Sequence, residues 1–179
     1  MKQFRNMNWV IAGLIFLVVF FLTIIFIKLL LIQLRSRFIL DVPNDRSSHS
    51  VPTPTGGGIA ILIIVCPALF CLGALEYLPQ IQVNLLCLLC IILAFVSWVD
   101  DLYGLNPFFR FAVHCGSVFC AILFGAIDGY VFGNIFTPAL DKIITAVLWV
   151  WFMNLFNFMD GIDGIVGVEI LGIGFGIFI

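Results

Sequence analysis

Charged residues are scarce in this chain, since only 10% of its 179 residues are charged and 63% are hydrophobic. A soluble domain usually carries about 25% charged residues, so this scarcity excludes an ordinary soluble fold. The formal net charge of −2 also provides no basic field that would attract nucleic acid. The sequence therefore predicts an integral membrane protein that sits in a lipid bilayer and does not bind nucleic acid.

The six cysteines lack the polar surroundings that disulfides or metal sites require. Each lies inside an apolar run, and Cys87 and Cys90 of the stretch LLCLLC have no histidine or loop beside them. A free cysteine in such surroundings behaves as a small hydrophobic side chain. Buried thiols are therefore favoured over metal binding or redox chemistry.

Long apolar runs occupy most of the sequence. A membrane-spanning helix needs about 20 apolar residues, with a range of about 17–25. Six runs come close to or reach this length, and Pro67 is expected to kink the second: 9–34, 58–75, 83–99, 111–127, 143–158 and 165–179. No small-residue cleavage site follows the first run, so we expect it to be retained. We predict an all-α, polytopic transmembrane helix bundle that forms one integral membrane domain over residues 1–179.

Six helices place alternate connecting segments on opposite sides of the bilayer. Segments 35–57, 100–110 and 159–164 then share one side, and the positive-inside rule identifies that side as cytoplasmic. Every unusual polar stretch of the sequence falls there, whereas the opposite loops carry few polar residues. The asymmetry indicates a single active face.

Two adjacent acids, Asp100 and Asp101, follow the third apolar run directly. An ionised carboxylate costs on the order of 2.5–3.5 kcal/mol at mid-bilayer, and two acids at the C-terminal end of a helix also oppose its dipole. A divalent cation would relieve both penalties, and carboxylate oxygens suit Mg²⁺, which also binds phosphate. The pair favours metal or phosphoryl-transfer chemistry over a merely solvated helix end.

The stretch NLFNFMDGIDG combines amides within a span with acids just after it. Asn154, Asn157 and Asp160 recur at a spacing of three, so they are expected on one helix face. The two glycines then break the helix and leave Asp160 and Asp163 at a tight turn. Because amides within a span normally face a partner helix or a polar cavity, a site is favoured over an ordinary turn.

The long polar segment DVPNDRSSHSVPTPTGGG precedes the second run. Its prolines restrict the backbone, and its glycines permit a ligand to approach the chain closely. Arg46 is able to hold a diphosphate through bidentate hydrogen bonds. On these features alone, a connector and a ligand-binding loop are equally favoured.

Two ionisable residues lie deeper within the later runs. Intramembrane ionisable groups usually face a bundle interior or a polar cavity. His114 is interpreted as a hydrogen-bonded intramembrane histidine rather than a base, and Glu169 as facing the bundle interior.

The three polar stretches DVPNDRSSHSVPTPTGGG, VDDLYGLNPFFR and NLFNFMDGIDG resemble, in order and spacing, the motifs of the polyprenyl-phosphate N-acetylhexosamine-1-phosphate transferases of glycosyltransferase family 4. The first stretch is similar to the branch that initiates O-antigen and enterobacterial common antigen. The resemblance implies a transfer of sugar-1-phosphate from a UDP-N-acetylhexosamine to undecaprenyl phosphate, with release of UMP. It also implies a role in lipopolysaccharide synthesis at the cytoplasmic face of the bacterial inner membrane. A multispan transporter is the alternative, which predicts acids within several spans.

The resemblance assigns roles to particular residues. It places Asp100 and Asp101 as catalytic residues beside the lipid phosphate and a bound Mg²⁺, with Mn²⁺ as an alternative ion. It places a further set of residues against the nucleotide-sugar donor: Asn157, Asp160, Asp163, Thr55, Arg46 and His49.

The sequence departs from the family pattern in its later part. The family's usual number of spans, about ten or eleven, exceeds the six predicted here, and an acidic MGDxGS-like motif and a His-containing loop are missing. Residues 165–179 would rise about 22 Å as a helix, short of a hydrocarbon core of about 30 Å. We expect the N-terminal portion of a transferase, inactive on its own; a truncated remnant or a membrane subunit is the alternative. The Asn154 and Asn157 face would then lack packing partners, so a homodimer is one expected assembly.

The predicted helix count is testable by labelling single cysteines in a Cys-free background. Cysteines at Ser48, Tyr103 and Ile162 should show one pattern of accessibility, opposite to that of a cysteine at Gln80, because an even number of helices separates the first three positions. Labelling of position 103 from the side that labels position 80 would show that the helix count is wrong.

Overall fold

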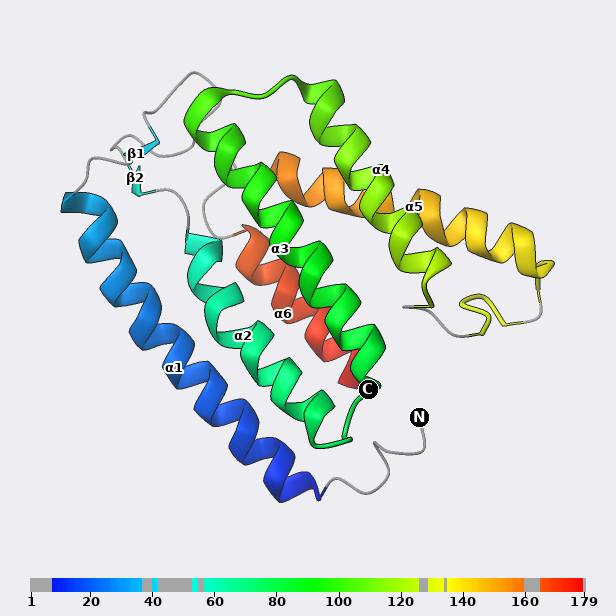
Figure 1. Ribbon diagram of the computed structural model, residues 1–179, viewed down its shortest axis with the longest axis horizontal. Coiled ribbons are helices and arrows are strands. Elements are labelled where there is room, and N and C mark those ends of the chain that lie inside the picture. The colour runs from blue at the N-terminus through cyan, green and yellow to red at the C-terminus, as the bar shows by residue number, and fades with distance from the viewer. Residues whose placement is uncertain are drawn as a thin grey trace. The chain divides into compact units, whose positions relative to one another are not determined.

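The computed structural model describes residues 8–36, 40–41, 53–54, 57–125, 129–133, 135–159 and 165–178 (Figure 1). Six helices lie within these ranges: α1 (Trp9–Ser36), α2 (Gly57–Ala74), α3 (Gln80–Tyr103), α4 (Pro107–Leu123), α5 (Pro138–Met159) and α6 (Ile165–Phe178). The two-residue strands β1 (Leu40–Asp41) and β2 (Thr53–Pro54) pair as a minimal sheet. The all-α fold is confirmed, with one helix for each apolar run.

The chain divides into two compact units. The first contains Met1–Ile39 and Pro54–Gly129, and the second contains Leu40–Thr53 and Tyr130–Ile179. Whether the chain acts as one membrane domain, as its composition predicts, stays a prediction.

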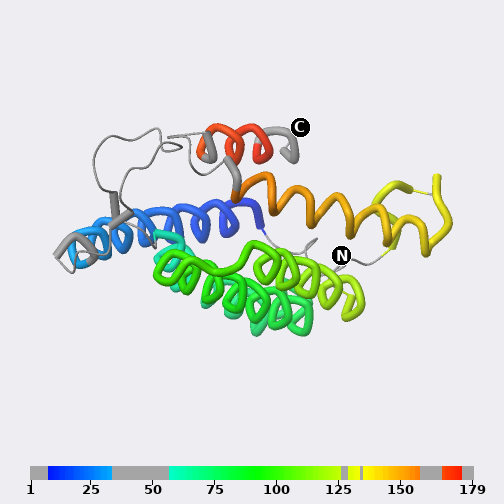
Figure 2. Tube along the Cα trace, turned by 90° about the horizontal axis from the view of Figure 1, so that it is seen from above, coloured from blue at the N-terminus to red at the C-terminus, as the bar shows by residue number. Residues whose placement is uncertain are grey.

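The first unit is a row of four helices, in which each helix packs against the next in sequence. Consecutive helices run in opposite directions (Figures 1 and 2), and the links from α2 to α3 and from α3 to α4 are short. Very few apolar side chains in the described part of the chain are enclosed by protein: Ala60, Val83, Val118 and Ala121. Large side chains such as Phe16 and Phe95 lie exposed instead. So much apolar surface suits lipid rather than water as the surrounding solvent.

Four of the helices are long and apolar enough to cross a membrane, namely α1, α2, α3 and α5. α2 runs through Pro67 as one helix. α4 has 17 residues and α6 has 14, so they rise only about 26 Å and about 21 Å against a hydrocarbon core of about 30 Å. The chain is a multi-pass membrane protein.

Two predicted boundaries shift around the adjacent acids. The third span was expected to end at residue 99, but α3 continues to Tyr103, so Asp100 and Asp101 lie within its last turn. α4 begins at Pro107 rather than at residue 111. Asn106 caps this helix and the fixed φ of Pro107 suits its first position, which explains the earlier start.

All six cysteines are free, as their apolar surroundings predict. Their expected burial is wrong in extent, because Cys71 and Cys90 are exposed and the other four are only half-buried. The cause is the arrangement of the first unit, in which a helix packs mainly against its sequence neighbours and leaves much of its surface uncovered.

The second unit contains a buried acid, Asp141, which is only 2% exposed in the first turn of α5. Its carboxylate accepts hydrogen bonds from the backbone N–H groups of Val131 and Phe132, each at 3.0 Å. A negative charge is also favourable at a helix N-terminus. The sequence placed Asp141 among the few polar residues of an opposite loop, whereas the structure shows it tying the preceding segment to α5.

Replacing Asp141 with alanine should loosen that segment. Each backbone N–H left without its acceptor costs about 1–3 kcal/mol where it is shielded from water. We expect the amides of Val131 and Phe132 to exchange hydrogen about tenfold to a hundredfold faster. The exposed neighbour Lys142 provides the control, since Lys142→Ala should leave both rates unchanged. Unaltered exchange in Asp141→Ala would contradict the assigned contact.

Candidate functional site

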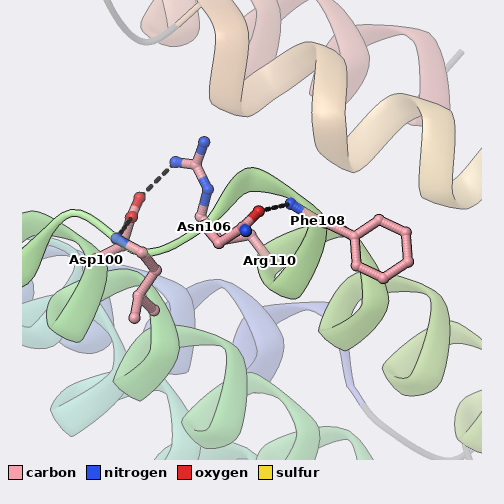
Figure 3. Close-up of polar contacts among 5 residues, drawn as sticks. Asp100, Asn106, Phe108 and Arg110 are labelled. Atoms are coloured by element: carbon pink, nitrogen blue, oxygen red, sulfur yellow. Dashed lines mark hydrogen bonds and ion pairs between the residues drawn. The ribbon is translucent and has the colours of Figure 1, made fainter.

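The most extensive polar cluster of the first unit is the α3–α4 turn, defined as residues 100–110 (Figure 3). α3 ends where the Gly104 N–H donates to the Asp100 carbonyl at 2.8 Å, with Gly104 at a φ of 65° that favours glycine. α4 begins where the Asn106 side chain accepts a hydrogen bond from the Phe108 N–H at 2.9 Å. Only three residues link the two helices, so the ends of α3 and α4 are held close together.

The Asp100 carboxylate bridges this link with both oxygens. Oδ1 accepts a hydrogen bond from the Leu105 N–H at 2.8 Å, and Oδ2 forms an ion pair with Nη1 of Arg110 (Figure 3). The side chain of Asp100 is 17% exposed and that of Arg110 is 31% exposed, so water screens the pair only in part. A guanidinium therefore offsets one of the two negative charges at the C-terminal end of α3, where the sequence predicted a metal ion alone.

Asp101 lies in a different environment, because its side chain is exposed. Neighbouring residues of a helix point about 100° apart, so the two carboxylates leave α3 in different directions. Two acids that are adjacent in the sequence thus differ in the structure: Asp100 is mostly covered and is held by Leu105 and Arg110, whereas the side chain of Asp101 is exposed.

These two carboxylates fit the way in which proteins usually hold Mg²⁺. Among the described residues, no three His, Cys, Asp or Glu side chains gather as a metal cage. Mg²⁺ commonly binds through one or two carboxylates and completes its coordination with water and substrate phosphates. That Asp100 and Asp101 hold Mg²⁺ in this way stays a prediction.

The amides of α5 belong to the second unit. Asn154 and Asn157 share one continuous helix, as their spacing predicts, and Asn157 is exposed. Asn154 is half-buried, and its Nδ2 donates to the Val150 carbonyl at 2.8 Å, so this amide turns back onto its own helix. The other predicted donor contacts lie outside the described residues, and their roles stay predictions: Arg46, His49, Thr55, Asp160 and Asp163.

Polar side chains continue along one face of α4 below the turn. Arg110, His114 and Ser117 follow each other at the spacing of helical turns. Nδ1 of His114 is buried without a hydrogen-bond partner in the described part of the chain, and so is Oε2 of Glu169 in α6. The hydrogen-bonded histidine that the sequence favoured is therefore not found at this nitrogen.

Arg110 is the site residue that sequence reasoning missed. It lies at the end of the predicted cytoplasmic segment 100–110, but the sequence assigned it no role in the site. Its position was informative nevertheless, because it lies one turn into a capped helix, directly after a link that also carries two acids.

An apolar groove of about 530 Å³ runs between α2 and α3. Ile59, Leu62 and Cys66 line it from α2, and Phe95 and Trp98 line it from α3. Trp98 precedes Asp100 by two residues, so the α3 wall of this groove reaches the α3–α4 turn.

Comparison with known proteins identifies a family. The model of glycosyl transferase family 4 matches residues 83–179. The chain is 28% identical over 137 residues to an undecaprenyl-phosphate alpha-N-acetylglucosaminyl 1-phosphate transferase of Escherichia coli K12, covering 72% of this chain and 36% of that protein. It is 27% identical over 135 residues to a decaprenyl-phosphate N-acetylglucosaminephosphotransferase of Mycobacterium leprae, covering 69% of this chain and 34% of the relative. The chain thus spans about a third of the length of these relatives, and no solved structure matches it.

The cap of α4 offers a test of the turn geometry. Asn106→Ala should destabilise the start of α4 by about 1 kcal/mol, because the Phe108 N–H loses its acceptor. Hydrogen exchange at Phe108 measures the loss, and Asn106→Asp, which retains an acceptor oxygen, should exchange like the unsubstituted chain. Equal exchange in all three proteins would show that Asn106 does not cap the helix.

Proposed function

Because the chain belongs to glycosyl transferase family 4, we propose that its acid pair takes part in transferring N-acetylhexosamine-1-phosphate from a UDP-sugar to undecaprenyl phosphate. The observation that carries the proposal is the position of Asp100 and Asp101 in the last turn of a helix long enough to cross the membrane. A lipid phosphate lies at the same depth, where the apolar layer ends. The names of the two relatives, an undecaprenyl-phosphate and a decaprenyl-phosphate enzyme, support the class of acceptor.

The proposed reaction exchanges one phosphoanhydride bond for another. An oxygen of the acceptor phosphate attacks the phosphorus that carries the sugar, the bond between the two donor phosphates breaks, and UMP leaves with the electron pair. Both reactants are anionic, so catalysis depends on neutralising charge and aligning the two phosphates. Mg²⁺, held by Asp100 and Asp101, would supply the positive charge when bound.

The chain's own residues fix the geometry of this step. The Leu105 N–H and Arg110 hold the Asp100 carboxylate in one orientation, while Asp101 presents its carboxylate at the exposed end of α3. On the donor side, Asn157 is proposed to contact the nucleotide sugar from the exposed surface of α5. Arg46, His49, Thr55, Asp160 and Asp163 are proposed as further donor contacts because they match motif positions of the family.

The finer assignments are part of the same proposal. We place the protein in the bacterial inner membrane with its active face toward the cytoplasm, where nucleotide sugars are made available. We assign it to the initiation of lipopolysaccharide O-antigen synthesis, with a homodimer as the proposed assembly.

A chimera tests the proposed role of the acid pair. Residues 1–179 are joined to the part of the Escherichia coli relative that follows its matched segment, and UMP release from UDP-N-acetylglucosamine is measured with undecaprenyl phosphate and Mg²⁺. Asp100→Asn and Asp101→Asn should each lower the turnover by about 10²- to 10³-fold, because an amide removes a charge needed at the transition state.

Glu76→Gln serves as the matched control, since Glu76 is an exposed acid in the link that precedes α3. This variant should release UMP at the unsubstituted rate. Full turnover in both aspartate variants, or no UMP release from the unsubstituted chimera, would overturn the proposal.

A further inference from the structure

We infer that Arg110 is a positioning residue for the proposed transfer, because it fixes the Asp100 carboxylate and thereby makes two adjacent aspartates different in function. The inference rests on the proposed function for the reaction and on the α3–α4 turn for the geometry. In this arrangement Asp100 is the oriented carboxylate, and Asp101 is the one exposed to incoming substrate.

The contacts of Asp100 come from both sides of the link. The Leu105 N–H holds Oδ1 at 2.8 Å from within the link, and Nη1 of Arg110 holds Oδ2 from the first turns of α4. A rotation of the carboxylate would break both contacts together. A carboxylate has about four lone-pair sites, so the two contacts fix its direction and still leave acceptor capacity for a cation or a substrate proton.

The ion pair between Asp100 and Arg110 also changes the charge at the α3–α4 turn. An arginine side chain stays protonated in proteins, so the charge that it places beside Asp100 is permanent. The ion pair is close to neutral, so the charge of the Asp100 carboxylate is largely offset. An anionic phosphate is therefore repelled less at this turn than it would be if Arg110 were absent.

Arginine suits this position better than lysine does. Only Nη1 of Arg110 contacts Asp100, and Figure 3 shows the other terminal nitrogen directed away from the carboxylate. The planar guanidinium holds its donors in a rigid fork, whereas a lysine ammonium is a point charge on a flexible stem. Arg110→Lys should therefore retain the charge and lose part of the orientation.

The first measurement uses the 179-residue chain and needs no turnover. Hydrogen exchange at the Leu105 amide reports how firmly Oδ1 of Asp100 is held. We expect Arg110→Gln to speed this exchange by about tenfold and Arg110→Lys to give an intermediate rate. Asp101→Asn and the charge control Lys142→Gln should leave it unchanged. Unchanged exchange in Arg110→Gln would overturn the inference.

The second measurement uses the chimera described above. Arg110→Gln should lower kcat by about 10- to 100-fold with the KM for the donor within about twofold of its original value, and Arg110→Lys should recover part of kcat. The variants are compared at equal concentrations of folded protein. If Arg110→Gln only reduced the amount of folded protein, kcat would be unchanged under this comparison, and Arg110→Lys would have no loss to recover.

The outcomes separate this inference from the proposed function. An active chimera whose kcat is unaffected by Arg110→Gln overturns the positioning role and leaves the transferase function standing. An unsubstituted chimera that releases no UMP overturns the proposed function, and the positioning role in that reaction falls with it.

Discussion

A single carboxylate joins the adjacent ends of α3 and α4. Asp100 belongs to the last turn of α3, yet its oxygens bind the link and the first turns of α4 through Leu105 and Arg110. Hydrogen bonds to charged groups stabilise by about 1.5–3 kcal/mol, a large contribution where little protein surface is enclosed. The orientation of the Asp100 carboxylate depends on this bridge.

Such polar contacts are important because lipid removes the usual driving force for helix packing. Apolar side chains gain little by leaving lipid for protein, so close fit and hydrogen bonds decide which helices meet. Gly73 illustrates the fit: a Cβ at this position would lie 2.6 Å from Oε1 of Gln80, so a larger residue here would require the Gln80 side chain to shift. Gln82 of α3 adds a long-range bond, donating to the Gly125 carbonyl at 2.8 Å.

The sequence was sufficient to predict the helices, because apolar runs of this length have few alternatives in a membrane. It was also sufficient to identify Asp100 and Asp101 as unusual, because charge is costly beside hydrocarbon. It did not predict that α3 would carry both acids within its last turn, since that depends on the cap at Gly104. Nor did it predict the partners of Asp100 and Asp141, because Arg110 and the amides of Val131 and Phe132 become neighbours only once the chain turns.

The link between α3 and α4 has three residues. Its length is more strictly constrained than the identity of the side chains around it. One residue inserted or removed between Tyr103 and Pro107 would change the span of this link and shift Arg110 relative to Asp100. Side chains around the link are less restricted, since Leu102 is 43% exposed and Phe108 is 78% exposed. The segment is therefore a spacer of fixed length, in which Gly104 and Asn106 are also needed for the left-handed turn and for the cap of α4.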